Sequence, residues 1–190
     1  TDITYASNAS LQISNQAAIY NLTLTGNAVF RLHGHSLITN TLTVTDGSSF
    51  KCQTTASSGT HRNFTTGGDL LIYGTVDCED AATITIGGGI LLNAGTFDAT
   101  SNSTIISGVL STGYVGMRID NGTTFNHNNG TFQFDNSGET WIASNTTGHD
   151  ITFKNLTING NIYINQADII VDNHLLINAS KSFRQYNAYN

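Results

Sequence analysis

Leu22-Thr-Leu-Thr-Gly26 and Leu42-Thr-Val-Thr-Asp-Gly47 carry the same short pattern, and their first leucines lie 20 residues apart. Each is an alternating apolar run that ends at a residue able to turn the chain, which is typical of a strand followed by a tight bend. The same spacing separates Leu70-Leu-Ile-Tyr-Gly74 from Ile90-Leu-Leu-Asn-Ala-Gly95. A unit of about 20 residues cannot bury its own apolar face, so the repeat predicts units that stack on one another.

Later copies are fainter. Asn155-Leu-Thr-Ile-Asn-Gly160 matches the segment that begins at Asn21, and Leu175-Leu-Ile-Asn-Ala179 follows it 19 residues after Leu156. The 66 residues from Ile90 to Leu156 fit three coils of about 22, with Val109-Leu110 and Phe132-Gln-Phe134 as the weaker copies. The 28 residues from Leu42 to Leu70 contain an excess, which we assign to a Ser/Thr/Gly-rich loop insertion at residues 54–66.

These spacings predict an all-β fold, a single-stranded parallel β-helix (β-solenoid) of about eight coils of roughly 20–22 residues, as one domain over residues 1–190. A β-sandwich, which turn signals at closer spacing would also permit, is the main alternative. A leucine-rich repeat is disfavoured because its longer consensus is absent.

Composition limits the partners. Charged residues make up 11% of the chain, the net charge is −6, and its seven Lys and Arg residues do not cluster, which argues against nucleic acid as a partner. No apolar run approaches the roughly 18 residues of a membrane span. Proline is absent, so Gly and Asn must form the bends.

Several segments resemble a repeat of large uncharacterised proteins of environmental microbes and their phages, which are exported or virion-associated. The likeness extends over most of residues 20 to 180 and rests on the segments that begin at Asn63, Thr123 and Phe153. The resemblance implies a β-solenoid with a surface, adhesive or appendage role. It carries no catalytic motif over to this chain.

Cys52 and Cys78 are the only cysteines, and each follows the bend of a neighbouring coil. Adjacent coils lie about 4.8 Å apart, within the Cα separation that a disulfide tolerates. The spacing therefore favours a disulfide between them, with two free thiols in the core as the alternative.

Two further segments could bind metal ions. His33-Gly34-His35 places two imidazoles on one face of a strand, but no cysteine or carboxylate lies at ligand spacing. Asp77-Cys-Glu-Asp80 is the densest acidic segment, yet it lacks the spaced pattern of calcium-binding repeats. We expect a polar sheet face and a solvated turn at these places, no metal site, and no cofactor.

An enzyme is the third possibility, because many parallel β-helices act on polysaccharides. Such chemistry needs paired or clustered carboxylates across a groove. The chain has two glutamates, Glu79 and Glu139, and its aspartates are spread through predicted turns. We expect no enzymatic activity.

Nine Asn-x-Ser/Thr sequons are consistent with a glycosylated, exported chain or with a composition rich in turn residues. Asn21 and Asn155 open predicted strands, which makes them poorer carriers than the others. The sites that we single out are Asn8, Asn63, Asn102, Asn121, Asn129 and Asn145.

The first residue, Thr1, is not methionine, so we expect either processing or a segment of a longer protein. Together with the cysteine pair, this favours a secreted protein of the extracellular space or cell surface. Neither end resembles a capping unit, and open ends predict head-to-tail self-association through residues such as Ile13, Phe183 and Tyr186. An excerpt whose missing coils provide the caps is the alternative.

We therefore expect a non-catalytic structural protein, a rigid subunit of an extracellular filament, surface layer or adhesin. The alternative is a virion or phage fibre segment that binds surface glycans. Trp141, Tyr114, Tyr186 and Tyr189 could provide a stacking platform for such glycans, although a tryptophan more often packs in a core or against a coil edge.

Overall fold

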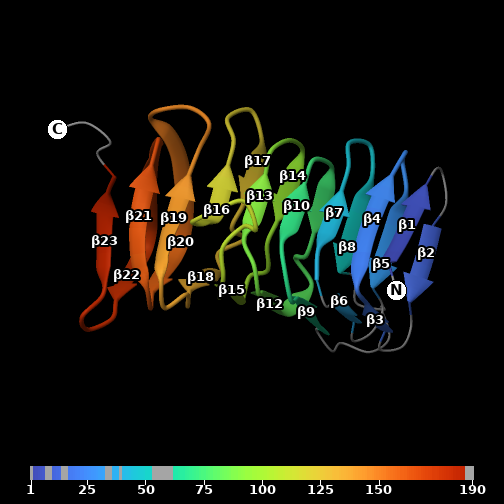
Figure 1. Ribbon diagram of the computed structural model, residues 1–190, viewed down its shortest axis with the longest axis horizontal. Coiled ribbons are helices and arrows are strands. Elements are labelled where there is room, and N and C mark those ends of the chain that lie inside the picture. The colour runs from blue at the N-terminus through green and yellow to red at the C-terminus, as the bar shows by residue number, and fades with distance from the viewer. Residues whose placement is uncertain are drawn as a thin grey trace.

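The computed structural model describes residues 2–6, 10–13, 17–32, 36–38, 40–52 and 62–186. Every regular element in these ranges is a β-strand, and the strands form three parallel sheets. The chain visits the sheets in turn, so that one circuit makes one coil and the next circuit stacks on it (Figure 1). The predicted β-solenoid is confirmed.

We call the three sheets A, B and C. Sheet A contains β1 (Asp2–Ala6), β4 (Asn21–Thr25), β7 (Leu42–Val44), β10 (Leu70–Ile72), β13 (Ile90–Leu92), β16 (Val115–Ile119), β19 (Glu139–Ala143), β21 (Asn161–Asn165) and β23 (Ser182–Gln185). Sheet B contains β2 (Ser10–Ile13), β5 (Val29–Leu32), β8 (Ser49–Cys52), β11 (Thr75–Asp77), β14 (Thr96–Asp98) and β17 (Thr124–Asn126). Sheet C contains β3 (Ala17–Ile19), β6 (Ser36–Ile38), β9 (Arg62–Thr66), β12 (Ala81–Ile86), β15 (Ser103–Ile106), β18 (Thr131–Phe134), β20 (His149–Ile158) and β22 (Ala167–Ile177).

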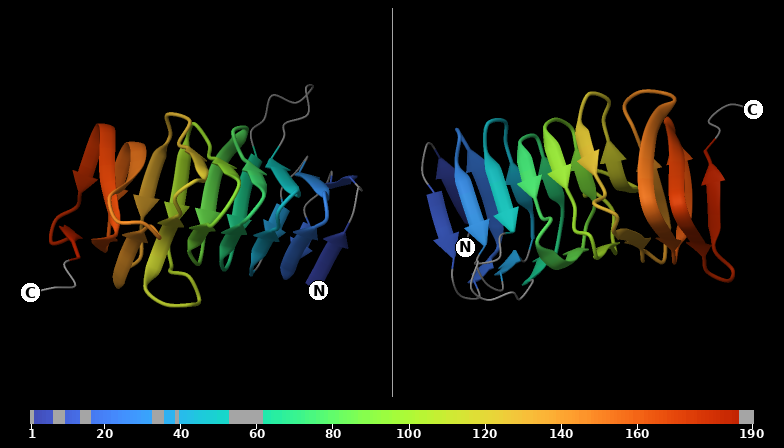
Figure 2. Two further views of the ribbon diagram at one scale, coloured as in Figure 1. Left: turned by 90° about the horizontal axis from the view of Figure 1, so that it is seen from above. Right: turned by 180° about the vertical axis from the view of Figure 1, so that it is seen from behind.

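The coils change character along the rod. From β1 to β18 each coil has one strand in each sheet. The next two coils pair a sheet A strand with one long strand, β20 or β22, and β23 begins a further turn. The coils follow one another along the long axis, so β1 and β23 lie at opposite ends of the molecule (Figure 2).

Alternating side chains explain why the strands hold together. β4 and β5 show the two-residue burial alternation of a strand with one face in the core and the other toward solvent. The bends between sheets A and B use residues with positive φ, including Gly47 at 75° and Gly95 at 74°. Glycine adopts this conformation without the steric penalty that a side chain brings, so it ends one strand and redirects the chain to the next sheet.

The interior is a continuous apolar column. Leu22, Leu42, Leu70 and Ile90 are paired coil to coil in sheet A and are fully buried, as the repeat predicted. Phenylalanines form a second stack, in which the rings of Phe30 and Phe50 lie 5.7 Å apart at an interplanar angle of 9°. Burying each large side chain contributes about 1.5–3 kcal/mol, so the coils are stabilised mainly by their neighbours.

The predicted repeat leaves sheet A in the second half of the chain and continues in sheet C. Leu156 is buried but lies in sheet C, where it pairs with Phe132, and so does not continue the ladder of Leu22. Leu175 pairs with Leu156, as the 19-residue spacing predicted, and its neighbour Leu176 is 52% exposed and faces outward. Any side of the solenoid accepts a short apolar run before a bend, so similar local sequences occupy different sheets.

The true continuation of the sheet A ladder has a different sequence. Ile90 pairs with Met117, which pairs with Ile142, and Ile142 pairs with Ile164. Val109 and Leu110, which we predicted as a weak strand copy, lie in a connection outside any strand. Because β16 has a glycine and an arginine beside its buried methionine, it does not resemble the leucine repeats.

The predicted insertion at residues 54–66 is partly a strand. Residues 62–66 form β9, which pairs with β6 and β12 in sheet C. The remainder, up to residue 61, lies outside the described residues.

Candidate functional site

Cys52, at the end of β8, and Cys78, directly after β11, meet inside the solenoid. Their Sγ atoms are 3.0 Å apart, and both side chains are buried. A disulfide bond is about 2.05 Å long, so the structure holds the two residues as thiols in contact. Cys52 and Cys78 are therefore neighbours, as predicted, whereas the disulfide bond between them stays a prediction.

Burial raises the pKa of the Cys78 thiol well above its usual value. The hydrogen bond between Cys78 and Cys52 and the negative charges of Asp77 and Asp98 act in the same direction. A charged thiolate is costly in this apolar interior, so Cys78 keeps its proton in the folded state.

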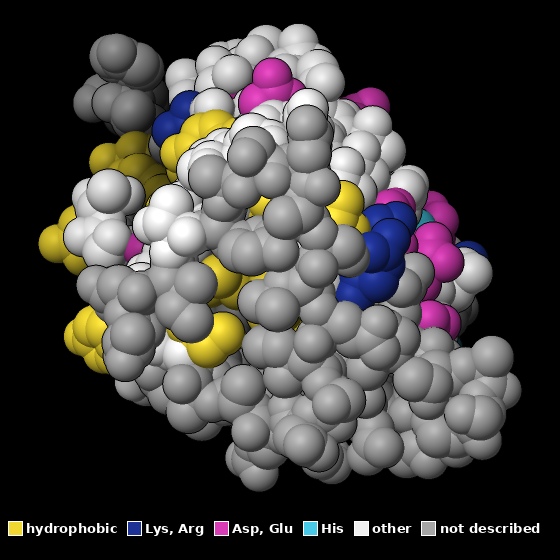
Figure 3. Space-filling view, turned by 90° about the vertical axis from the view of Figure 1, so that its right-hand side faces the viewer, with side chains coloured by type: hydrophobic (Ala, Val, Ile, Leu, Met, Phe, Trp, Pro, Cys, Tyr) yellow, Lys and Arg dark blue, Asp and Glu magenta, His cyan; other side chains and the backbone are white. Residues whose placement is uncertain are grey.

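The acidic segment lies on the outer side of sheet B. Lys51 and Asp77 are paired in register and form a salt bridge of 3.6 Å. Figure 3, viewed from the β1 end, shows Lys and Arg side chains beside Asp and Glu side chains along one side of the molecule. Partial desolvation is the main cause that raises the pKa of Glu79, and the negative charges of Asp77, Asp98 and Asp80 raise it further.

No group of three or more His, Cys, Asp or Glu side chains within the described ranges is arranged to hold a metal ion. His33, His35 and His61 lie outside the residues whose side chains are described. His127 accepts a hydrogen bond from the backbone N–H of Asn129 through Nδ1 and so stabilises a turn.

Several carboxylates that a catalytic site would need have structural partners. Asp69 is buried and accepts hydrogen bonds from the backbone N–H groups of Gly89 at 3.1 Å and Ser111 at 3.0 Å. Asp120 is buried beside Arg118, whose Nε lies 2.6 Å from its Oδ1. Asp120 also accepts a hydrogen bond of 2.7 Å from Nδ2 of Asn93, so both aspartates link neighbouring coils.

Most of the selected sequons are accessible. The structure places Asn63, Asn102, Asn121, Asn129 and Asn145 at exposed positions, and Asn8 lies outside the described residues. Asn21 and Asn155 are half-buried in strands, as their sequence context predicted.

The last two described strands, β22 and β23, which together we call the open coil, leave the apolar interior open. Leu175 pairs with the buried Leu156 and Ile177 pairs with the buried Ile158, so both point along the inner face. They are nevertheless 48% and 40% exposed, because no described coil stacks beyond them. Phe183, in β23, pairs with Ile162 and packs against the edge of the same core.

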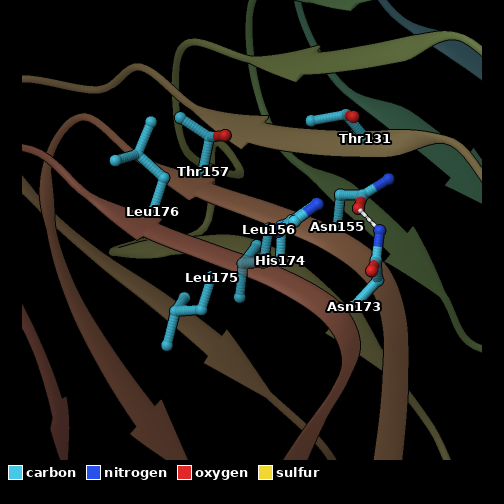
Figure 4. A pocket seen from close by; sticks show the side chains of 8 residues that line it. All are labelled: Thr131, Asn155, Leu156, Thr157, Asn173, His174, Leu175 and Leu176. Atoms are coloured by element: carbon cyan, nitrogen blue, oxygen red, sulfur yellow. Dashed lines mark hydrogen bonds between the residues drawn. The ribbon is translucent and has the colours of Figure 1, made fainter.

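A shallow pocket of about 570 Å³ lies beside this coil, lined by residues of β18, β20 and β22. Figure 4 shows Leu175 and Leu176 pointing to opposite sides of β22, with Leu176 near Thr157. Asn173 donates a hydrogen bond of 2.9 Å to Asn155 across the pocket. The pocket has one titratable side chain, His174, and so offers no acid–base pair.

The other predicted assembly residues are Ile13, at the opposite end of the solenoid, and Tyr186, which directly follows β23. Ile13 ends β2, an edge strand of sheet B, and its side chain is outside the description. Tyr186 is 40% exposed and its ring contacts Trp141 at 4.8 Å between ring centroids.

That contact belongs to an aromatic row that the sequence only partly revealed. Tyr114 and Trp141 lie 6.1 Å apart, and Tyr186 also meets Tyr163 at 6.3 Å. Tyr163 was missed because it lies 22 residues from Trp141 in sequence, and only the pairing of β19 with β21 brings them together. Tyr189 is outside the described residues.

No family model, curated protein or solved structure matches this chain. The resemblance to exported and virion-associated repeats thus has support in the β-solenoid fold alone. No helix within the described ranges has the length and apolar character needed to cross a membrane.

Proposed function

We propose that this chain is a non-catalytic structural protein, a rigid rod that associates end to end into an extracellular filament, surface layer or adhesin. The observation that carries the proposal is the open coil of β22 and β23, where Leu175 and Ile177 point along the core yet remain solvent-accessible.

The proposed occupant of this open coil is the first coil of a second copy. β22 and β23 are edge strands of sheets C and A at one end, and β3 and β1 are the edge strands of the same sheets at the other. An unpaired parallel edge is a template for another strand, and the apolar inner face adds hydrophobic stabilisation. A contact between opposite ends of identical copies does not close on itself, so it generates a linear polymer.

An exported location forms part of the proposal. It is supported by accessible sequons on several coils and by two cysteines in contact, a pair that an oxidising compartment would convert to a disulfide. The intact mass of the native chain tests this part, since a mass equal to that of the bare, reduced polypeptide argues against export through a glycosylating, oxidising route.

Assembly is tested with the purified 190-residue chain by sedimentation velocity and negative-stain electron microscopy across a range of concentrations. We expect rods whose length grows with concentration. Leu175→Asp places a charge on the open inner face and should suppress assembly, as should a charge at Phe183.

Leu176→Asp is the matched control, because Leu176 is the adjacent leucine, is similarly exposed, and faces outward. Circular dichroism of both variants confirms that the monomers fold alike. A wild-type chain that remains monomeric at high concentration overturns the proposal and favours a segment of a longer solenoid. Equal assembly of the two variants also overturns it.

A further inference from the structure

Four aromatic side chains form a continuous row on the outside of sheet A near the β23 end. Ring centroids are 6.1 Å apart between Tyr114 and Trp141, 4.8 Å between Trp141 and Tyr186, and 6.3 Å between Tyr186 and Tyr163. The first two pairs have interplanar angles of 32° and 33°, and at 4.8 Å the rings of Trp141 and Tyr186 lie partly over one another.

The row is not part of the core. Its members are absent from the buried apolar cluster, and Tyr114 is 63% and Tyr186 40% exposed. Trp141 and Tyr163 are half-buried at register positions that face outward from β19 and β21. Contiguous exposed apolar surface on a protein commonly marks an interaction site, so a contiguous row of partly exposed aromatic rings points to a ligand.

The backbone holds the row in place before any ligand binds. The N–H of Trp141 donates to the carbonyl of Tyr114 at 2.8 Å, and the N–H of Tyr186 donates to the carbonyl of Ile164 at 2.8 Å. The Tyr163 hydroxyl lies 3.4 Å from Oε1 of Glu139. The backbone at Trp141 and Tyr186 is thus fixed before binding, which lowers the entropy lost on binding.

Polar side chains border the rings. In the register of sheet A, Glu139 lies opposite Asn161, and Arg184 lies opposite Tyr163. Carboxylate, amide and guanidinium groups provide hydrogen-bond acceptors and donors next to flat apolar faces. This combination suits a ligand with an apolar face and a hydroxyl-rich edge, which is the character of a pyranose ring.

We propose that Tyr114, Trp141, Tyr163 and Tyr186 form a binding surface for a polysaccharide, whose sugar rings stack on the aromatic row along the axis of the rod. A nucleic acid would also stack on aromatic rings, but it requires clustered cations, and the surface here combines Arg184 with Glu139 in a chain of net charge −6. A stable protein interface covers roughly 800 Å² per partner and favours a broader apolar centre than a single row bordered by charges.

Three members of the row, Tyr114, Trp141 and Tyr163, lie outside the open coil, whereas Tyr186 directly follows β23. A Tyr114→Ala variant therefore tests sugar binding without altering the end-to-end contact. In a polymer, however, each copy would present the same row, and repeated weak contacts to one polysaccharide would add through avidity.

The experiment uses the single tryptophan of the chain, Trp141, as its own reporter. Tryptophan emission is followed while the folded protein is titrated with hexasaccharides of cellulose, xylan, mannan and chitin, and with a single-stranded oligothymidylate. We expect a saturable change with at least one hexasaccharide and none with the oligonucleotide.

Tyr114→Ala should weaken binding by about tenfold, since it removes the most exposed ring while Trp141 still reports. The control is Tyr20→Ala, because Tyr20 is 53% exposed and lies outside the row. Trp141→Ala, followed by affinity electrophoresis in the polysaccharide that bound, should abolish retention.

Three outcomes would overturn the proposal. The first is the absence of a saturable response to any hexasaccharide. The second is a response to the oligonucleotide alone. The third is equal affinity of the Tyr114→Ala and Tyr20→Ala variants.

Discussion

At the scale of single residues, the burial of Cys78 beside Cys52 makes the free energy of unfolding of the reduced protein depend on pH. An exposed thiol would not have this effect. The folded-state pKa of Cys78 is raised by burial, whereas the unfolded chain has a thiol pKa of about 8.5. Below that value both states hold the proton, so the free energy of unfolding is unaffected. Above it the unfolded state releases the proton and the folded state does not.

The free energy of unfolding of the reduced protein should therefore fall by up to about 1.4 kcal/mol per pH unit above roughly pH 8.5. Urea titrations between pH 7 and 9.5, in the presence of reductant, measure the slope. Cys78→Ala should lack this contribution. Parallel pH profiles of the wild type and the variant would contradict the raised pKa.

The same pair predicts an effect of oxidation. If Cys52 and Cys78 form a disulfide in an oxidising medium, the bond closes a loop across 26 residues and should stabilise the protein by about 2–4 kcal/mol. The measurement is the mass of native protein after alkylation in denaturant without reductant. Two alkyl groups on the chain would show free thiols and refute the bond.

At the scale of elements, the bends between sheets A and B require a positive φ, which the strands do not. Gly95 has a φ of 74°, and a Cβ there would lie 2.0 Å from the carbonyl oxygen of Gly74 in the preceding coil. Gly122 has a comparable φ of 86°, but a Cβ there would meet no atom within 4 Å. Both positions require a positive φ. They differ in how closely a neighbouring coil approaches.

Gly122→Ala should cost about 1–2 kcal/mol, the usual penalty of a left-handed conformation with a side chain. Gly95→Ala should cost clearly more, because the new methyl group also pushes two coils apart. Thermal or urea unfolding of the two variants measures the difference. Equal destabilisation would mean that φ alone, and not coil packing, governs these bends.

Polar side chains also stack from coil to coil, at the bends that follow the strands of sheet C. Nδ2 of Asn159 donates to Asp135, and Nδ2 of Asn178 donates to Asn159, so three successive coils share one ladder. Gln133 donates to Asp135 at 2.8 Å. Such ladders explain how a chain with 11% charged residues satisfies its polar groups without repulsion between coils.

At the scale of the whole molecule, each coil contacts only its neighbours, so stability should vary along the rod. Backbone amides of the central coils, β10 to β15, are covered on both sides, whereas β22 and β23 form the open coil. Hydrogen exchange followed by mass spectrometry should show the slowest exchange over residues 70–106 and faster exchange over residues 182–186.

The dependence of hydrogen exchange on protein concentration tests whether the open coil takes part in assembly. If a second copy covers the open coil, exchange over residues 182–186 should slow as the protein is concentrated, while the central coils change little. Exchange that is uniform along the rod would contradict nearest-neighbour stabilisation.

The sequence by itself determined the solenoid class and the strands and bends of the regular leucine repeats. Alternation of apolar residues sets which side chains face inward within one strand, and glycine at a bend sets where it ends; both are local properties that a window of a few residues contains. The 20-residue spacing of Leu22 and Leu42 then extends this local information to the stacking of neighbours.

Only the tertiary structure decided which strand stacks on which where the spacing varies. Leu156 resembles Leu22 in its local sequence but lies in sheet C, and Met117 continues the sheet A ladder without resembling it. The aromatic row and the open coil also depend on register between distant segments. The physical reason is that all three sides of the solenoid accept the same short apolar pattern, so the choice among them comes from packing against the previous coil and not from the strand itself.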